Sequence, residues 1–149
     1  TRLPSASSLT ATLIVPLSGC RLCFPHCLPI YRLTNMKLFV YGTLMNYSGQ
    51  MKRFSPESKF ITNSVVVGYS IYSLGGFPGI KEVHGSQVYG EIWDVPESDI
   101  PRLDAYESEG RLYLRNVVGT YNNEQLQAYV YNHPVRDADR IKSGYWLDR

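Results

Sequence analysis

The chain has 149 residues, which suits one domain, and 44% of them are hydrophobic, enough for a packed core. No apolar run approaches the roughly 20 residues that a membrane-spanning helix needs. The first 35 residues hold three arginines and no acidic residue, so the net charge of +2 originates there and residues 36–149 carry −1. This near-neutral body argues against nucleic acid as a partner.

Residues 1–35 differ from the rest of the chain. They contain four of the nine prolines, show neither strand nor helix periodicity, and do not begin with Met. An apolar strand pattern then starts at Met36. We therefore predict a folded domain over residues 36–149, preceded by a disordered or non-native leader over residues 1–35.

The leader has two other interpretations. Four of its residues have a spacing that can bind zinc, although zinc sites usually take a second ligand pair farther along the chain: Cys20, Cys23, His26 and Cys27. The apolar run over residues 9–17, followed by LSGC at residues 17–20, resembles a bacterial lipoprotein signal, which would anchor the protein to a membrane. All three cysteines lie in the leader, so the domain forms no disulfide of its own, as is compatible with a cytoplasmic location.

The first half of the domain is predicted to consist mainly of strands. Its opening residues are almost purely apolar, as in a strand buried on both faces. Gly68 predicts a bend or bulge within the second strand. The elements are a strand over residues 36–41, a short helix or ordered loop over 46–54, a strand over 64–74, a turn-rich loop over 75–79 and a strand over 87–95.

The second half contains the one clear helix. Pro96 and the acidic and Ser residues after it favour a helix N-terminus, so the helix is predicted over residues 97–107. Because no strand–helix–strand alternation is visible, the pattern predicts an α+β domain with a small, closed, mixed sheet. The remaining elements are strands over 112–121 and 125–131, a hairpin turn at 121–124, and a short helical or irregular end over 143–149.

Glu107 is the most informative residue of the chain. It follows Ile100 by two helical turns, so its carboxyl lies about 20° from the apolar face that Ile100 and Leu103 form. Burial and the negative end of the helix dipole both raise a carboxyl pKa toward neutrality, as a general acid or base requires. A helix that ends early would instead leave Glu107 in a solvated loop.

Two further patterns point to ligand binding, and each has an ordinary structural explanation. Gly42 follows a buried strand, where it can turn successive backbone N–H groups outward to bind a carboxylate or phosphate, or can mark a plain turn. Tyr113 and Arg115 share one strand face. There Arg115 can pair with Glu107 or Asp104, bind a substrate carboxylate, or face solvent.

Motifs for several other chemistries are missing. The sequence has no phosphate loop, no dinucleotide fingerprint and no Gly-x-Ser-x-Gly elbow. The two histidines of the domain, His84 and His133, have no carboxylate or Cys at metal-ligand spacing. We therefore predict neither a metal nor a cofactor.

The ordered set of motifs resembles the gamma-glutamylcyclotransferase-like family over about residues 36–146, and it is most similar to the gamma-glutamylamine cyclotransferase branch. The matching pieces are FVYGTL at 39–44, GGFPGI at 75–80, VYGEIWDV at 88–95, LDAYES at 103–108, LYLR at 112–115 and AYVY at 128–131. This resemblance implies a small β-barrel with flanking helices.

The resemblance also implies an activity, the cleavage of a gamma-glutamyl amine or gamma-glutamyl amino acid to 5-oxoproline and a free amine. It implies that Glu107 is the catalytic carboxylate, and Glu109 departs from the pattern by adding a negative charge at the mouth of the site. The alternative is a non-catalytic module that binds a small metabolite on the same fold. The residues implied to hold or border the substrate are Tyr41, Gly42, Thr43, Leu44, Gly76, Gly79, Tyr113 and Tyr131.

Overall fold

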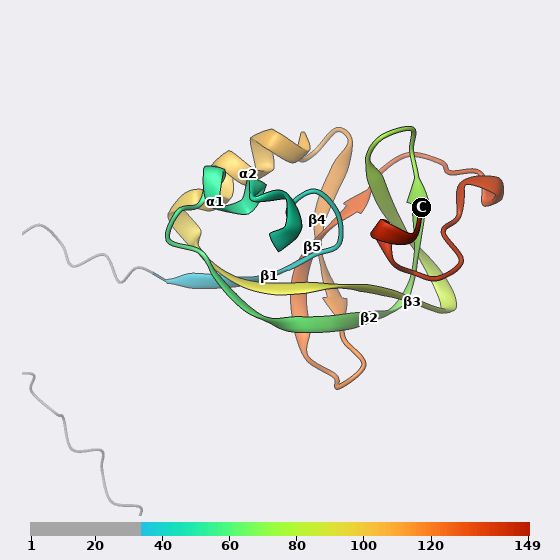
Figure 1. Cartoon of the computed structure of the whole chain (residues 1–149), viewed down its shortest axis with the longest axis horizontal. Helices are drawn as coiled ribbons and strands as arrows, with labels where there is room; N and C mark the ends of the chain where they lie inside the picture. Colours follow the sequence, from blue (N-terminus) through green and yellow to red (C-terminus); the bar gives the residue numbers. More distant parts are fainter. Residues whose placement is uncertain (1–33) are drawn as a thin grey trace, which may run out of the picture. The chain divides into compact units, whose positions relative to one another are not determined.

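The computed structural model describes residues 34–149, so the zinc and lipoprotein interpretations fall outside the described residues. Five strands and several short helices form the predicted α+β fold (Figure 1). The strands are β1 (Asn35–Val40), β2 (Lys59–Ser73), β3 (Pro78–Pro96), β4 (Tyr113–Gly119) and β5 (Gln125–Tyr131). The α-helices are α1 (Gln50–Phe54) and α2 (Ile100–Glu107), and the 3-10 helices are η1 (Asn46–Ser48), η2 (Glu97–Asp99), η3 (Asp137–Asp139) and η4 (Trp146–Asp148).

The five strands form one mixed sheet in the order β2-β3-β1-β5-β4. The central strand β1 runs antiparallel to β3 and parallel to β5, where Leu38 pairs with Gln127 and Phe39 with Ala128. The prediction of a small mixed sheet is therefore confirmed. The position of β1 also brings the loop after it close to segments from the second half of the chain.

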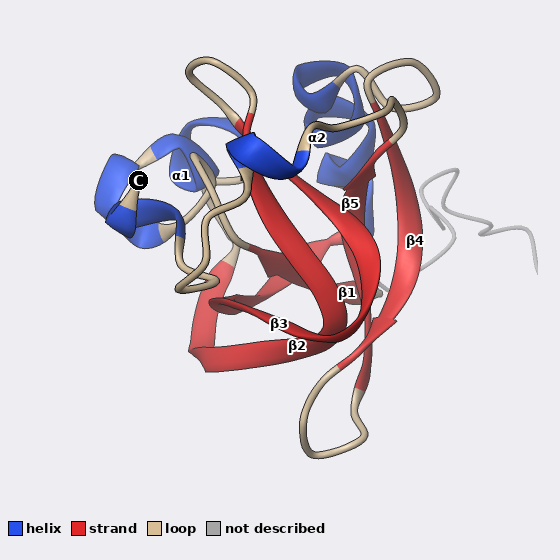
Figure 2. Ribbon diagram, turned by 90° about the vertical axis from the view of Figure 1, so that its right-hand side faces the viewer, coloured by secondary structure: helices blue, strands red, loops and turns tan. Residues whose placement is uncertain are grey.

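The predicted closed barrel is not confirmed. Figure 2 shows a strongly curved sheet, yet its two edge strands meet at one place. There Val66 forms a single bridge with Thr120, and the N–H of Tyr121 donates to the carbonyl of Val65 over 3.0 Å. Because no further ladder joins the edge strands β2 and β4 beyond this bridge, the sheet is curved but open.

Two strands are longer than predicted. β2 begins at Lys59 and not at Ser64, and β3 begins at Pro78 and not at Gln87. The first five residues of β2 are all exposed, so they show none of the alternation by which a strand is recognised. Gly68 has a φ of 81° beside a shift in the β2–β3 register, which confirms the predicted bulge.

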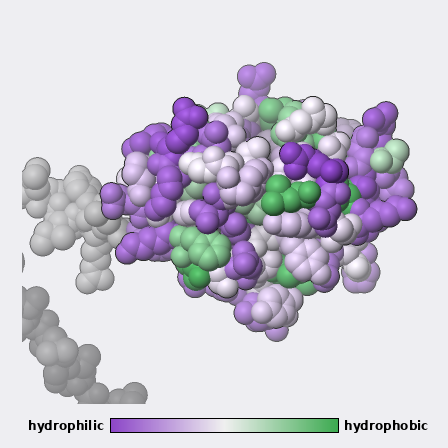
Figure 3. Space-filling model, in the orientation of Figure 1, coloured by the Kyte–Doolittle hydropathy of each residue, from purple (hydrophilic) through white to green (hydrophobic). Residues whose placement is uncertain are grey.

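The core combines the sheet with the helices and the C-terminal segment. Its largest fully buried side chains include Phe39 from β1, Trp93 from β3, Leu103 from α2 and Trp146 from η4. On the outer face drawn in Figure 3, hydrophobic residues are scattered among hydrophilic ones. In the described part of the chain no helix has the length and apolarity needed to cross a membrane. The cytoplasmic location stays a prediction.

Candidate active site

A cavity of about 320 Å³ lies where several elements meet. Its walls come from the end of β1 and the loop after it, the start of β3, the C-terminus of α2, and strands β4 and β5. Seven of the nine predicted site residues line it. The lining residues are Phe39, Val40, Tyr41, Gly42, Thr43, Leu44, Gly76, Phe77, Pro78, Tyr106, Glu107, Leu112, Tyr113 and Tyr129.

Glu107 is placed in this cavity by helix α2. The buried face of the helix is formed by Ile100 and Leu103, and the helix continues to Glu107 before Ser108 ends it with a φ of 52°. The side chain of Glu107 is half-buried, and burial raises the pKa of its carboxyl from 4.5 to about 7. At neutral pH the carboxyl can therefore both accept and release a proton.

The loop after β1 presents backbone donors. Among the described residues, no backbone carbonyl accepts from the N–H groups of Gly42, Thr43 or Leu44. Such donors can hold an anion without a basic side chain. Gly42 is needed here because a Cβ would lie 2.3 Å from Cγ of Pro78, so the close approach of β3 excludes a side chain.

Three tyrosines line the cavity together with Glu107. The hydroxyl of Tyr41 donates to the carbonyl of Tyr129, and that of Tyr113 donates to the carbonyl of Pro78. Burial raises the pKa of all three tyrosines, and the negative charge of Glu107 raises each further. Because Tyr129 also donates its proton elsewhere, the three oxygens are acceptors for a ligand.

Arg115 is paired with Asp104. Its Nε lies 3.2 Å from Oδ1 of Asp104, and the same oxygen accepts from the hydroxyl of Tyr129 over 2.7 Å. Of the partners that the sequence allowed for Arg115, Asp104 is the one observed. Glu109 is not among the residues that line the cavity, and its carboxylate faces the backbone N–H of Arg115 at 3.5 Å. The predicted negative charge at the mouth stays a prediction.

Gly79 and Tyr131 are the two predicted site residues that do not line the cavity. A Cβ on Gly79 would lie 2.8 Å from Cβ of Tyr131, so the two residues pack tightly together. The ring of Tyr131 meets that of Tyr113 edge to face, with centroids 5.7 Å apart. Tyr131 thus contacts a lining residue, and a direct role in binding stays a prediction.

Several lining residues were missed by the sequence analysis. Tyr106 precedes Glu107, and Tyr129 lies two residues from Tyr131 on the same strand face, so both had a signal in the chain. Phe77 and Pro78 fall within residues 76–79, which the resemblance implied to border the site. Leu112 had no signal as a site residue, because tertiary structure brings it to the cavity. Phe39 and Val40 belong to a strand that was predicted as core.

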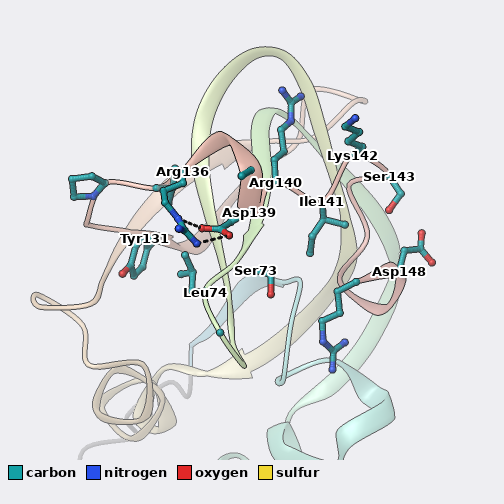
Figure 4. A pocket seen from close by; sticks show the side chains of 15 residues that line it. Ser73, Leu74, Tyr131, Arg136, Asp139, Arg140, Ile141, Lys142, Ser143 and Asp148 are labelled. Atoms are coloured by element: carbon teal, nitrogen blue, oxygen red, sulfur yellow. Dashed lines mark hydrogen bonds and ion pairs between the residues drawn. The ribbon is translucent and has the colours of Figure 1, made fainter.

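A second, wider groove of about 850 Å³ lies along the C-terminal segment (Figure 4). An ion pair joins Arg136 Nε and Asp139 Oδ2 over 2.9 Å. Arg140 donates to the hydroxyl of Ser86 over 2.6 Å, and both Arg140 and Lys142 line the groove (Figure 4). The smaller cavity is the stronger candidate, because a half-buried carboxyl and unpaired backbone donors converge there.

Fold and cavity together describe a small α+β protein whose cavity holds one half-buried carboxyl beside backbone N–H groups that have no backbone partner among the described residues. Residues 34–149 contain no group of three or more His, Cys, Asp or Glu residues placed to hold a metal ion.

Residues 38–148 match the family described as gamma-glutamyl cyclotransferase, AIG2-like. A gamma-glutamylcyclotransferase family protein, ytfP of Citrobacter rodentium, is 35% identical over 121 residues, covering 76% of this chain and 97% of the relative. Gamma-glutamylaminecyclotransferase A of Danio rerio is 30% identical over 127 residues, covering 76% of this chain and 75% of the relative. A solved gamma-glutamyl cyclotransferase shares the fold at 18% identity, with a TM-score of 0.55 over 66% of this chain and 68% of that one.

The chain belongs to the gamma-glutamyl cyclotransferase, AIG2-like family. The resemblance that the motifs indicated is confirmed, and with it the prediction of an enzyme of the gamma-glutamylcyclotransferase type.

Proposed function

We propose that this chain converts a gamma-glutamyl amine or gamma-glutamyl amino acid to 5-oxoproline and a free amine, with Glu107 as general base and then general acid. One observation carries the proposal: the half-buried carboxyl of Glu107, with a pKa of about 7, lines the same cavity as the backbone donors of the loop after β1. The names of the relatives support the class of substrate.

The chemistry needs one proton-carrying group. The α-ammonium of the substrate gives a proton to Glu107, and the freed NH2 group attacks the γ-carbonyl carbon to close a five-membered ring. Glu107 returns this proton to the leaving nitrogen as the bond from that carbon to it breaks, and it takes the second proton of the ring nitrogen, which leaves a neutral lactam. Glu107 then gives the second proton to the released amine, which departs as an ammonium ion and leaves the carboxylate as it began. All atoms of the substrate appear in the two products. Because the reaction is intramolecular, holding the substrate folded supplies much of the acceleration.

The remaining cavity residues have binding roles in this proposal. The backbone N–H groups of Gly42, Thr43 and Leu44 hold the substrate α-carboxylate or the developing oxyanion. The oxygens of Tyr41 and Tyr113, whose own protons are donated to backbone carbonyls, accept from the α-ammonium. This orients the ammonium toward Glu107.

The alternative of a binding module without catalysis is less well supported. Binding a metabolite does not need a carboxyl held near its ionisation point at neutral pH, and half-burying one opposes stability. The relatives also carry cyclotransferase names.

The direct test is to incubate the protein with a panel of gamma-glutamyl amines and amino acids and to follow 5-oxoproline by mass spectrometry. A protein-free sample corrects for spontaneous cyclisation. We expect enzyme-dependent 5-oxoproline from at least one compound. If calorimetry shows binding but no compound yields 5-oxoproline, the binding module replaces the enzyme.

A further inference from the structure

The motif VYGEIWDV at residues 88–95 has no part in the site described so far. It belongs to β3, which pairs with β1, and none of its residues lines the cavity. Gly90 packs closely against the end of β1, because a Cβ there would lie 2.3 Å from the carbonyl oxygen of Val40. The next residue, Glu91, is the register partner of Val40. Glu91 therefore lies beside the point where β1 ends and the loop with the backbone donors begins.

The carboxylate of Glu91 holds the far end of this loop. Its Oε2 accepts from the backbone N–H of Asn46 over 2.8 Å and from the indole Nε1 of Trp93 over 2.8 Å. Asn46 is the first residue of η1, where a backbone N–H has no partner within the helix, and the N-cap residue Met45 supplies no side-chain bond. Because Trp93 is 1% exposed, its bond ties the acceptor oxygen of Glu91, and with it the loop, to the core.

Hydrogen bonds within the loop connect this anchor to the donors. The N–H of Met45 donates to the carbonyl of Gly42 over 3.0 Å, and the hydroxyl of Ser48 donates to the carbonyl of Thr43. The segment from Gly42 to Ser48 is thus joined to itself along its length. Of the described side chains outside this segment, Glu91 is the one that hydrogen-bonds its backbone. A change at Glu91 therefore reaches the donors through the loop.

We propose that Glu91 is a positioning residue, which fixes the backbone donors of Gly42, Thr43 and Leu44 where they meet the substrate α-carboxylate. This inference rests on the proposed function and adds a residue to it. Glu91 does not line the active-site cavity, so it acts through the loop and touches no substrate. Both of its bonds end on Oε2, so the amide oxygen of a glutamine in the same place can accept them as well.

The physical reason lies in preorganisation of the loop. Several N–H groups bind one carboxylate well only if they already converge when the ligand arrives, and a displacement of about 1 Å weakens binding strongly. Without the bond to Glu91, the loop is free to move at Asn46, and the donors before it lose their common direction. Because the α-carboxylate keeps its charge throughout the reaction, this loss weakens binding of the substrate and of the transition state alike. It therefore raises KM and changes kcat little.

Two substitutions of Glu91 separate its acceptor oxygen from its bulk. Glu91→Leu removes the acceptor, so KM should rise at least about tenfold while kcat stays within about threefold of the wild type. Glu91→Gln keeps an acceptor and should return KM to within about threefold of the wild type. Ser55→Ala is the control for a plain loss of stability, because it removes a buried bond to Asp99 and should lower the melting temperature without changing KM. Wild-type KM in a folded Glu91→Leu protein, or no recovery in Glu91→Gln, overturns the inference.

Asn46→Pro removes the donor of the same bond and decides the question if Glu91→Leu fails to fold. Met45 has a ψ of 159°, which suits a residue before proline, and proline is favoured at the first position of a helix. The melting temperature should therefore stay close to that of the wild type while KM rises as in Glu91→Leu. Asn46→Ala keeps the N–H and should keep the wild-type KM.

The two halves of the bond should also behave as one. Combining Glu91→Leu with Asn46→Pro should raise KM little beyond either substitution alone, because both remove a single interaction. Wild-type KM in Asn46→Pro overturns the inference and leaves the proposed function intact. A wild type that forms no 5-oxoproline from any compound of the panel overturns both.

Discussion

At the scale of single residues, Glu107 is held where burial opposes its charge. The folded protein keeps its carboxyl protonated up to a pKa of about 7, whereas the ordinary value is 4.5. Between these two pH values the folded state binds more protons than the unfolded state, so stability falls as pH rises through this window. A site that needs a proton carrier near neutral pH thus has a cost in stability.

This cost gives a pH-dependent prediction. Glu107→Gln removes the titrating group, so the variant should match the wild type near about pH 4 and be more stable near about pH 8, by up to about 3 kcal/mol. Urea unfolding of both proteins across this range measures the difference. A difference that does not grow with pH would show that Glu107 titrates normally.

Gly42 must lack a side chain for two reasons: the loop proposed to bind the substrate runs through it, and the ring of Pro78 packs against it. Gly42→Ala would place a Cβ 2.3 Å from the Pro78 ring, so we expect a loss of about 1–3 kcal/mol in stability together with a lower kcat/KM. Gly119→Ala is the control, because a Cβ there has open space, and it should leave both quantities nearly unchanged. Wild-type stability and activity in Gly42→Ala would contradict the close packing of this loop.

At the scale of elements, the sequence predicted the helices and strands whose apolar residues recur at helix or strand spacing. It missed the segments whose residues are all exposed. The helix that ends at Glu107 was found from its acidic start and the spacing of Ile100 and Leu103, and burial of this pair confirms it. The beginning of β2 was missed because Lys59 and the four residues after it face solvent on both sides. The first half of β3 was also missed: its first two residues were predicted as part of the loop over 75–79, and residues 80–86 were assigned to no element.

The candidate site, too, was predicted where the spacing along the chain is informative and missed where it is not. Glu107 was predicted from spacing, because helix geometry fixes the face on which it lies. Phe77 and Tyr129 could not be placed in this way, since one lies in a loop and the other reaches the cavity through the parallel pairing of β5 with β1. Because these residues are far apart in the sequence from the rest of the site, local patterns do not predict that they meet.

Helix α2 is joined to the sheet by Asp104, which accepts from Arg115 and Tyr129. Asp104→Asn should release both partners, destabilise the fold by about 1–3 kcal/mol and lower kcat, because Tyr129 lines the cavity beside Glu107. Asp139→Asn breaks an ion pair with the highly exposed Arg136 and should change stability by less than about 1 kcal/mol. If the two variants behave alike, Asp104 does not position the site.

At the scale of the whole molecule, the described structure begins before the predicted boundary at Met36. Thr34 donates to Glu97 over 2.6 Å, and Asn35 is the first residue of β1 and donates to Asp94 over 2.7 Å. These are exposed bonds, which contribute little to stability.

A protein that begins at Thr34 should therefore melt at the same temperature as the full chain, and one that begins at Met36 should melt only slightly lower. Differential scanning calorimetry of the three proteins compares them. A large loss in the protein that begins at Thr34 would show that residues 1–33 contribute to folding.

The central claim is that Glu107 transfers the proton in a cyclisation that yields 5-oxoproline, and one comparison tests it most directly. The rate of 5-oxoproline formation is measured for the wild type, Glu107→Gln and Glu109→Gln, with melting temperatures as a check on folding. Glu109 is two residues away and does not line the cavity, so its variant should keep the wild-type rate. Gln is nearly isosteric but accepts no proton, so Glu107→Gln should lose at least about 10²–10⁴-fold in rate. A folded Glu107→Gln protein with near wild-type turnover would contradict the mechanism.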